Sequence, residues 1–296
     1  MTTVPPYPTS HGLLEGKTLL VTAAAGTGIG FATAKRCAEE GATVAVSDKH
    51  ERRLAESAEA LGGALAVPCD VTNEGDVQAM FGRVLGELGR LDVLVNNAGL
   101  GGTAPLTEMT DEQWSAVLDV TLNGTFRCTR AALRHMVPRQ SGVIVNNASV
   151  LGWRAQVGQA HYAAAKAGVM ALTRCAALEA APAGVRVNAV SPSLAMHPFL
   201  SKAIDEETLD ELVTLEAFGR SAEPWEVANV IVFLASDYSS YMTGEVVSVS
   251  SQHPQSRSSH RRTRRARRIP RSMGDLGWIG AVENVWLAAL GLTYMP

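Results

Sequence analysis

The sequence predicts one α/β domain in which helices cover both faces of a parallel, doubly wound sheet of about seven strands. Three observations support this prediction. Short runs of Val, Ile, Leu and Ala recur along residues 19–249, amphipathic stretches separate most of them, and a glycine-rich turn follows the first run. Strands that are buried on both faces read as continuous apolar runs, whereas covering helices carry apolar residues at helical spacing.

The apolar runs are the predicted strands. They are Leu19–Thr22, Thr43–Ser47, Leu65–Val67, Val93–Asn96, Val143–Asn147, Val185–Val190 and Val246–Val249. Between them, stretches such as Phe31–Glu40 and Asp76–Leu88 have the apolar spacing of helices. This alternation indicates a parallel sheet, and the doubly wound domain is predicted to span residues 12–251.

Length and composition agree with a single large core, because 46% of the 296 residues are hydrophobic. Cys37, Cys69, Cys128 and Cys175 are scattered without metal-ligand spacing. We therefore expect reduced thiols, no metal site and a cytoplasmic protein. Residues 1–11 lack the basic start and apolar run of a secretory signal, and we expect them to form a flexible segment.

Residues 252–296 are predicted to be an Arg-rich, disordered extension. Residues 257–296 hold eight arginines against two acidic residues, although the whole chain has a net charge of −3. Such a run could bind nucleic acid or an anionic membrane, and the apolar stretch Leu276–Pro296 could suggest an anchor. Glu283 and Asn284 interrupt that stretch. We expect neither a nucleic-acid nor a membrane partner.

A dinucleotide site is predicted where the first strand ends. Glycines in such a turn let backbone amides approach a pyrophosphate, and the N-terminus of the next helix adds about half a positive charge. The turn residues expected to contact the cofactor are Gly26, Thr27, Gly28, Ile29 and Gly30. A glycine turn between a strand and a helix is the context of a Rossmann-type fold.

The residue at the end of the second strand bears on which dinucleotide is bound. Asp48 stands about 20 residues beyond the turn, where a carboxylate can accept hydrogen bonds from both ribose hydroxyls and repels a 2′-phosphate. NAD is therefore favoured. Lys49, Arg52 and Arg53 follow closely and could neutralise a phosphate, so NADP stays open. The other interpretation of Asp48 is a solvated loop acid.

Ser149, Tyr162 and Lys166 form the candidate catalytic set. Tyr162 and Lys166 are one helical turn apart and so share a helix face, and Ser149 follows the fifth apolar run. A phenol has a pKa of about 10 and is a poor base near neutrality. A neighbouring ammonium group favours the phenolate and lowers that pKa, which would let Tyr162 accept a proton from a substrate hydroxyl.

With these motifs in order, residues 12–249 resemble the short-chain dehydrogenase/reductase family. The resemblance implies NAD(P)-dependent interconversion of a secondary hydroxyl and a ketone, with Ser149 holding the substrate oxygen, and it implies a homotetramer or homodimer. In that family the segment after the fourth strand shapes the cofactor site, and the end of the third strand holds the adenine. The cofactor-side positions implied here are Asn97, Ala98, Gly99, Asp70, Val71 and, at the nicotinamide ribose, Tyr162 and Lys166.

The sequence departs from the family pattern in the turn and in the central helix. The turn is one residue longer when counted from Thr22, and Gly26 is the candidate to replace its first glycine. Thr121 occupies the position of the family's catalytic asparagine, which helps to hold a water that relays protons to the lysine. Asn123 is two residues on and would point to another side of a regular helix. Either Thr121 takes that role differently or the relay is altered.

Two further departures lie near the nicotinamide end. Pro192-Ser193 stands where Pro-Gly is expected, and His197 aligns with the threonine that commonly meets the carboxamide, so Pro192 and His197 are implied cofactor contacts. Val249-Ser250-Ser251 replaces a common Asp-Gly-Gly. Together with Asn146–Gln156, these departures resemble bacterial dehydrogenases of steroid C- and D-ring breakdown. That narrower resemblance implies a bicyclic, CoA-linked methyl-indanone substrate.

Trp153 and Arg154 are the candidate substrate residues. An indole offers an apolar face to a ring system and a guanidinium pairs with carboxylate or phosphate, although loop packing and a solvated charge are the alternative. Residues Leu194–Phe218 are expected to form a mobile lid. Two other functions stay open, which are an NADPH-dependent reductase of 3-oxoacyl thioesters or other small ketones and a non-catalytic nucleotide-binding regulator.

Overall fold

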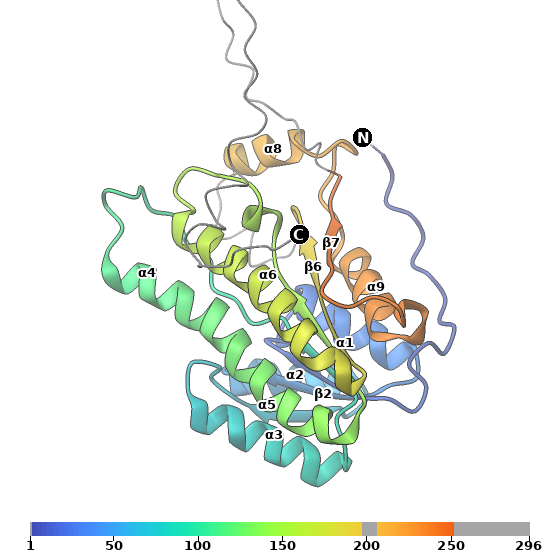
Figure 1. Ribbon diagram of the computed structural model, residues 1–296. Coiled ribbons are helices and arrows are strands. Elements are labelled where there is room, and N and C mark those ends of the chain that lie inside the picture. The colour runs from blue at the N-terminus through green and yellow to red at the C-terminus, as the bar shows by residue number, and fades with distance from the viewer. Residues whose placement is uncertain (1, 197–205, 252–296) are drawn as a thin grey trace, which may run out of the picture. The chain divides into compact units, whose positions relative to one another are not determined.

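The computed structural model describes residues 2–196 and 206–251, which contain one seven-stranded sheet. The strand order is β3-β2-β1-β4-β5-β6-β7, and all neighbouring strands run parallel. Figure 1 shows helices on both faces of this sheet. The predicted fold class, a doubly wound α/β domain, is therefore confirmed.

The strands coincide with the apolar runs of the sequence, and their ends differ from the predicted ones by at most two residues. They are β1 (Thr18–Thr22), β2 (Thr43–Asp48), β3 (Leu65–Pro68), β4 (Val93–Asn96), β5 (Gly142–Asn147), β6 (Val185–Pro192) and β7 (Val246–Val249). The chain order reverses between β1 and β4. In open parallel sheets, ligands bind beyond the carboxyl ends of the strands at such a switch point.

The helices form a layer on each face. On one face lie α1 (Ile29–Glu39), α2 (Glu51–Ala60) and α9 (Pro224–Ala235), and on the other lie α3 (Glu74–Leu88), α5 (Gly124–Arg139) and α6 (Ala160–Ala180). The remaining helices are α4 (Asp111–Leu118) before α5 and α8 (Glu206–Thr214) before α9. A π-helical segment, η1 (Asp119–Asn123), joins α4 to α5, and three short 3₁₀ turns, η2 (Val150–Gly152), η3 (Ala181–Ala183) and η4 (Asp237–Ser239), complete the described elements.

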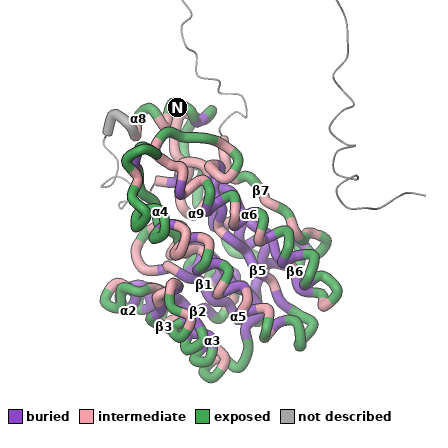
Figure 2. The backbone as a smooth tube through the Cα atoms, turned by 60° about the vertical axis from the view of Figure 1, so that its left-hand side comes forward, coloured by how far each residue is buried: buried purple, intermediate pink, exposed green. Residues whose placement is uncertain are grey.

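Each face of the sheet has its own apolar core, because successive strand residues point to opposite sides. Leu20 and Ile144 pack with α3, α5 and α6, whereas Leu19 and Val21 pack with α1, α2 and α9. Figure 2 shows the central strands buried beneath both helical layers. Burial on both faces explains why the strands read as unbroken apolar runs and not as alternating ones.

The N-terminal segment, residues 2–11, has no regular secondary structure. The Tyr7 hydroxyl donates to the Glu39 carboxylate at 2.8 Å, and its ring meets Trp225 edge-on with 5.3 Å between the ring centroids. The flexibility of this segment stays a prediction. His197, part of the predicted lid and the Arg-rich extension lie outside the described residues. Within the described ranges, no helix is long and apolar enough to cross a membrane.

Candidate active site

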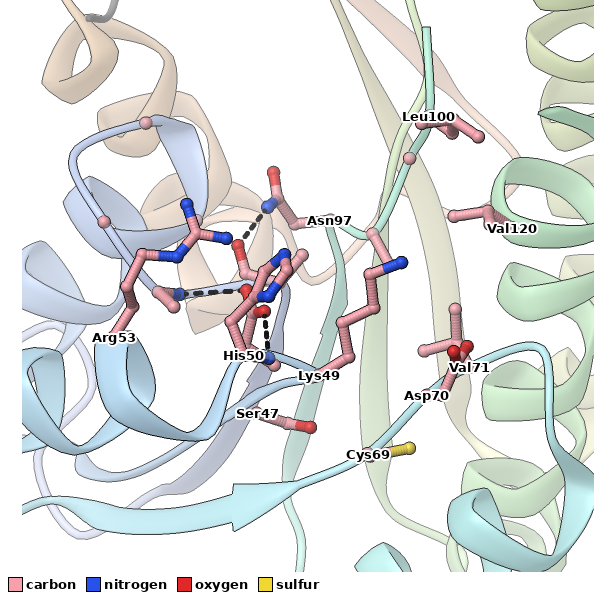
Figure 3. A pocket seen from close by; sticks show the side chains of 18 of the residues that line it. Ser47, Lys49, His50, Arg53, Cys69, Asp70, Val71, Asn97, Leu100 and Val120 are labelled. Carbon is pink, nitrogen blue, oxygen red and sulfur yellow. Dashed lines mark hydrogen bonds between the residues drawn. The ribbon is translucent and has the colours of Figure 1, made fainter. Parts of the chain in front are cut away.

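A pocket of about 530 Å³ opens at the carboxyl ends of β1, β2 and β4 (Figure 3). The structure brings the predicted cofactor residues of four sequence segments together around it. From the sequence prediction these are Gly26, Thr27, Gly28, Ile29, Gly30, Asp48, Asp70, Val71, Asn97, Ala98 and Gly99. The pocket therefore lies at the switch point of the sheet, and its floor consists largely of strand ends and the glycine turn.

The glycine turn is shaped by steric limits on its backbone. Gly26 has φ +107°, a conformation that a residue with a side chain rarely adopts. A Cβ on Gly30 would lie 2.4 Å from the Ala23 carbonyl oxygen and 2.5 Å from the Asn97 amide nitrogen. Helix α1 begins just after Gly28, and no side chain caps it. This N-terminus can therefore present its amides and dipole to a phosphate group.

Asp48 holds the turn as well as facing the pocket. Its Oδ2 accepts from the Ala25 amide at 3.3 Å and its Oδ1 from the His50 amide at 3.0 Å. Lys49, His50 and Arg53 line the same pocket. This part of the pocket wall therefore carries the Asp48 carboxylate together with three basic side chains.

Arg52, which the sequence offered as another phosphate partner, does not line this pocket. It pairs instead with Glu56 at 3.0 Å on the exposed face of α2, where its side chain is 83% exposed. The basic side chains that face the pocket from this helix and the loop before it are those of Lys49, His50 and Arg53.

Asn97 ties the ends of three strands together. Its amide nitrogen donates to the Ala23 carbonyl at 3.0 Å, and its side-chain oxygen accepts from Asn147 at 2.9 Å. The backbone amides of Asn97 and Ala98 both donate to the Thr22 hydroxyl. These hydrogen bonds hold the carboxyl ends of β1, β4 and β5 together, so Asn97 stabilises the shape of the pocket.

Ser149, Tyr162 and Lys166 lie together beside that pocket. Ser149 lies close enough to the Tyr162 phenol to affect its pKa, and the Lys166 ammonium lies 5.5 Å from the centre of the Tyr162 ring. Lys166 donates to the Asn147 carbonyl and is almost fully buried. A Cβ on Gly99 would lie 3.6 Å from the Lys166 nitrogen. The loop after β4 therefore connects the pocket to the catalytic set.

The electrostatics of this set differ from the expectation that Lys166 lowers the pKa of Tyr162. Burial raises the pKa of the Tyr162 phenol, and the hydrogen bond from Ser149 opposes that rise. Burial also lowers the pKa of Lys166 to about 8. Both shifts have one physical reason, because removal of water disfavours the phenolate and the ammonium alike.

Thr121 uses its hydroxyl to hold the loop after β4. Its Oγ1 accepts from the Leu100 amide at 3.0 Å and donates to the Leu100 carbonyl at 3.3 Å. The Thr121 carbonyl accepts from the Thr125 hydroxyl at 2.8 Å. The structure therefore assigns Thr121 a positioning contact, and its role in a proton relay stays a prediction.

The helical segment around Thr121 is not regular, so the assumption of a regular helix there was wrong. Residues Asp119–Asn123 form a π-helix, named η1, between α4 and α5. An inserted residue of this kind changes which side chains share a face, and π-turns are frequent at functional sites. Asn123 still points elsewhere, because its amide donates to the exposed Asp119 carboxylate at 3.1 Å.

The predicted substrate and nicotinamide residues lie on neighbouring loops. The short turn η2 follows Ser149, and Trp153 comes directly after η2. Trp153 is 51% exposed, whereas Arg154 is half-buried. Pro192 ends β6 opposite Val249 of β7. The pocket of about 530 Å³, called the dinucleotide pocket below, is not lined by Pro192, Tyr162 or Lys166.

Sequence reasoning missed several pocket residues that are neighbours of its motifs. Leu100 follows Asn-Asn-Ala-Gly, Val120 precedes Thr121, and Cys69 precedes Asp70. Each of these residues could have been predicted to line the pocket because it is adjacent in sequence to a recognised motif. In the part of the chain that the structure describes, no group of three or more His, Cys, Asp or Glu side chains could hold a metal ion.

Comparisons with known proteins agree with this architecture. A family model described as enoyl-(acyl carrier protein) reductase matches residues 23–251. The chain is 64% identical over 250 residues, 82% of its length and 95% of the relative's, to the Mycobacterium tuberculosis (5R,7aS)-5-hydroxy-7a-methyl-1-oxo-2,3,5,6,7,7a-hexahydro-1H-indene-carboxyl-CoA reductase. It is 41% identical over 240 residues, 80% of its length and 97% of the relative's, to a 3-oxoacyl-(acyl-carrier-protein) reductase of Thermotoga maritima.

A solved structure gives the same result at the level of the fold. A short chain dehydrogenase from Mycobacterium smegmatis superposes with a TM-score of 0.76 at 58% sequence identity. The match covers 85% of this chain and 98% of that one. Identity of this extent over nearly the whole relative indicates a shared architecture and not a shared motif alone.

Proposed function

Because the chain belongs to the short-chain dehydrogenase/reductase family of oxidoreductases, we propose that it interconverts a secondary hydroxyl and a ketone by hydride transfer with NAD(H). We propose a bicyclic, steroid-derived CoA thioester as the substrate. The observation that carries the reaction class is the meeting of three groups: Lys166 is buried 5.5 Å from the centre of the Tyr162 ring, and Ser149 lies close enough to the phenol to affect its pKa. These three groups lie next to a pocket whose glycine turn suits a dinucleotide.

In the proposed mechanism the side chains manage the proton and hold the reacting oxygen. The nicotinamide, when bound, supplies the hydride acceptor for oxidation or the hydride donor for reduction. In oxidation the Tyr162 phenolate takes the proton of the substrate hydroxyl, and Ser149 holds that oxygen by a hydrogen bond. As an ammonium 5.5 Å from the Tyr162 ring centre, Lys166 would stabilise the phenolate and so oppose the effect of burial on the Tyr162 pKa. In reduction Tyr162 returns the proton to the forming alcohol.

The residues present fit a dinucleotide. Gly26 and Gly30 would allow the backbone to approach a pyrophosphate at the uncapped start of α1. Asp48 faces the pocket at the position where a carboxylate would meet the ribose hydroxyls. Asp70 and Val71 line the adjacent wall, where we place the adenine.

The alternative cofactor is NADPH, with a 3-oxoacyl thioester or another small ketone as substrate. Two observations favour it. Lys49, His50 and Arg53 line the pocket near Asp48 and could neutralise a 2′-phosphate, and a relative at 41% identity is named a 3-oxoacyl-(acyl-carrier-protein) reductase. The bicyclic substrate is preferred because the relative at 64% identity is named for it. The exposed Trp153 indole beside Ser149 offers an apolar surface for such a ring system.

We also propose a homotetramer or homodimer in the cytoplasm. Trp114 on α4, Phe126 on α5 and Leu178 on α6 are 37%, 42% and 78% exposed. These exposed apolar side chains are available for contact with a second copy of the chain. The described cysteines are free thiols, as expected of a reducing compartment.

The test is turnover of a panel of secondary alcohols and ketones with each dinucleotide. The panel contains bicyclic hydroxy-indanone CoA thioesters, hydroxysteroids and 3-oxoacyl thioesters, and each is assayed with NAD(H) and NADP(H). We expect the highest kcat/KM for the bicyclic CoA thioester with NAD(H). A strong preference for NADPH would overturn the assignment of Asp48, and dinucleotide binding without turnover of any substrate would favour the non-catalytic regulator.

A further inference from the structure

His161, immediately before the catalytic tyrosine, is a buried polar residue that the proposed mechanism does not use. Its side chain is 2% exposed, so it has no surface to offer a substrate. Its Nδ1 accepts a hydrogen bond from the backbone amide of Tyr162 at 2.9 Å. An imidazole that accepts at Nδ1 carries its proton at Nε2, which assigns the tautomer from the hydrogen bond.

This bond replaces an ordinary helix cap. The first amides of a helix have no partner within the helix, and the residue just before the helix normally supplies one from its side chain. In α6 that residue is Gln159, and its side chain makes no capping bond. The amide of Tyr162, the third residue of α6, is bonded by His161 instead.

Gln159 is used to attach the helix to the β4–α4 loop, residues 97–110. Its side-chain amide donates to the Thr103 hydroxyl at 2.9 Å, and the Ala104 amide donates to the Gly158 carbonyl at 3.1 Å. Gly158 has φ +76°, and a Cβ there would lie 2.7 Å from the Thr103 methyl group. The start of α6 and this loop are therefore in close contact.

His161 lies at the same junction. A Cβ on Gly102 would lie 3.4 Å from the His161 Nε2 atom, so the imidazole lies next to this loop. The same loop begins with Asn97–Leu100 at the dinucleotide pocket and is held at Leu100 by Thr121. One imidazole thus bonds to the backbone of the catalytic tyrosine and lies next to the loop that leads to the cofactor pocket.

We propose that His161 is a positioning residue, whose Nδ1 atom fixes the first turn of α6 and thereby sets the Tyr162 phenol against Ser149 and Lys166. The inference rests on the proposed function only for its effect on turnover. Misplacement of a reacting group by about 1 Å can cost on the order of 100-fold in rate. Loss of the bond should therefore lower kcat and leave dinucleotide binding almost unchanged.

Two variants separate the acceptor atom from the bulk of the side chain. In His161→Asn the Oδ1 atom occupies the same place after Cγ as the imidazole Nδ1, so an acceptor is kept. In His161→Phe a ring is kept and the acceptor is lost. We expect kcat to fall about 10- to 100-fold in His161→Phe and to stay within about threefold of wild type in His161→Asn. The KM for dinucleotide should change less than about twofold in both.

Hydrogen exchange provides a readout that needs no turnover. In peptides that cover residues 158–166, one more amide should exchange rapidly in His161→Phe than in the wild type, and His161→Asn should restore its protection. If no substrate is turned over but this exchange pattern is found, the proposed function fails and the structural assignment of His161 stands.

The inference on His161 is overturned if His161→Phe has wild-type kcat and exchange, or if His161→Asn loses as much as His161→Phe in both measurements. If His161→Phe does not fold, His161→Leu replaces it, because leucine is smaller and also lacks an acceptor. We expect the same fall in kcat and the same faster exchange for His161→Leu.

Discussion

The dinucleotide pocket and the catalytic set are built in different ways, although the loop after β4 joins them. The pocket depends on backbone, since Gly26 has a positive φ and Gly30 has no room for a Cβ. The catalytic set depends on side-chain chemistry in a buried environment. Burial raises the pKa of Tyr162 and lowers the pKa of Lys166, so both shifts favour the neutral side chain. Changes in the first region should therefore act on binding, and changes in the second on the chemical step.

Tyr162→Phe should have the largest effect on turnover and so gives the strongest test of this difference between the two regions. It removes the group that takes the substrate proton, and general acid–base groups contribute about 10²- to 10⁴-fold to rate. We expect kcat to fall within that range while the dissociation constant of the dinucleotide changes less than about threefold. Steady-state kinetics and fluorescence titration measure the two effects separately. A large loss of dinucleotide affinity in this variant would contradict the division between the regions.

Gly30→Ala should give the opposite pattern. The added Cβ would meet the Ala23 carbonyl oxygen at 2.4 Å and Asn97 at 2.5 Å, so the turn must shift. Overpacking of this kind costs about 1–3 kcal/mol, which we expect as a lower melting temperature and weaker dinucleotide binding. Gly82→Ala in α3 is the matched control, because a Cβ there meets nothing within 4 Å. Equal behaviour of the two variants would refute the steric account of the turn.

Thr121→Val tests the connection between the regions. It removes the hydroxyl that bonds to both backbone groups of Leu100, and an unsatisfied buried polar group costs about 1–3 kcal/mol. We expect kcat/KM to fall roughly 10-fold, which corresponds to 1.4 kcal/mol. Thr121→Ser keeps the hydroxyl and should retain most of the activity. If the serine variant is as impaired as the valine variant, the loss cannot be assigned to the hydroxyl bonds with Leu100, and this account of Thr121 is wrong.

Lys166 provides a test of a different kind, which is the dependence of stability on pH. Its pKa is about 8 in the folded protein and 10.5 without the fold. Between these values the unfolded chain binds the extra proton, so the free energy of unfolding should rise with pH from about 8 to 10.5. Lys166→Met removes this contribution. Between about pH 8 and 10.5 the melting temperature of the wild type should therefore rise relative to that of the variant. Parallel curves for the two proteins would show that Lys166 is not desolvated.

The two regions also differ in how far the sequence could predict them. A positive φ at a glycine and a carboxylate at the end of a strand follow from local rules, so the pocket residues Gly26, Gly30 and Asp48 could be found from spacing. The direction of the Tyr162 pKa could not, because it depends on burial by residues distant in sequence. The π-helix at Asp119–Asn123 and the cap that His161 gives to Tyr162 carry no signal in apolar spacing.

The family and the fold were predictable because several motifs occur in a fixed order along one domain. The narrower resemblance to dehydrogenases of steroid ring breakdown agrees with the relative at 64% identity. The choice between NAD and NADP is harder to predict, since it depends on a balance of charge among Asp48, Lys49, His50 and Arg53 around one pocket.

The most direct test of the central claim follows the hydride itself. The bicyclic hydroxy CoA thioester is prepared with deuterium on the carbon that bears the hydroxyl and is mixed with wild-type enzyme and NAD in a single turnover. We predict that one equivalent of the deuterium per active site appears in the reduced dinucleotide. Reduced dinucleotide without the label, or no reduced dinucleotide from any secondary alcohol in the panel, would contradict the proposed reaction.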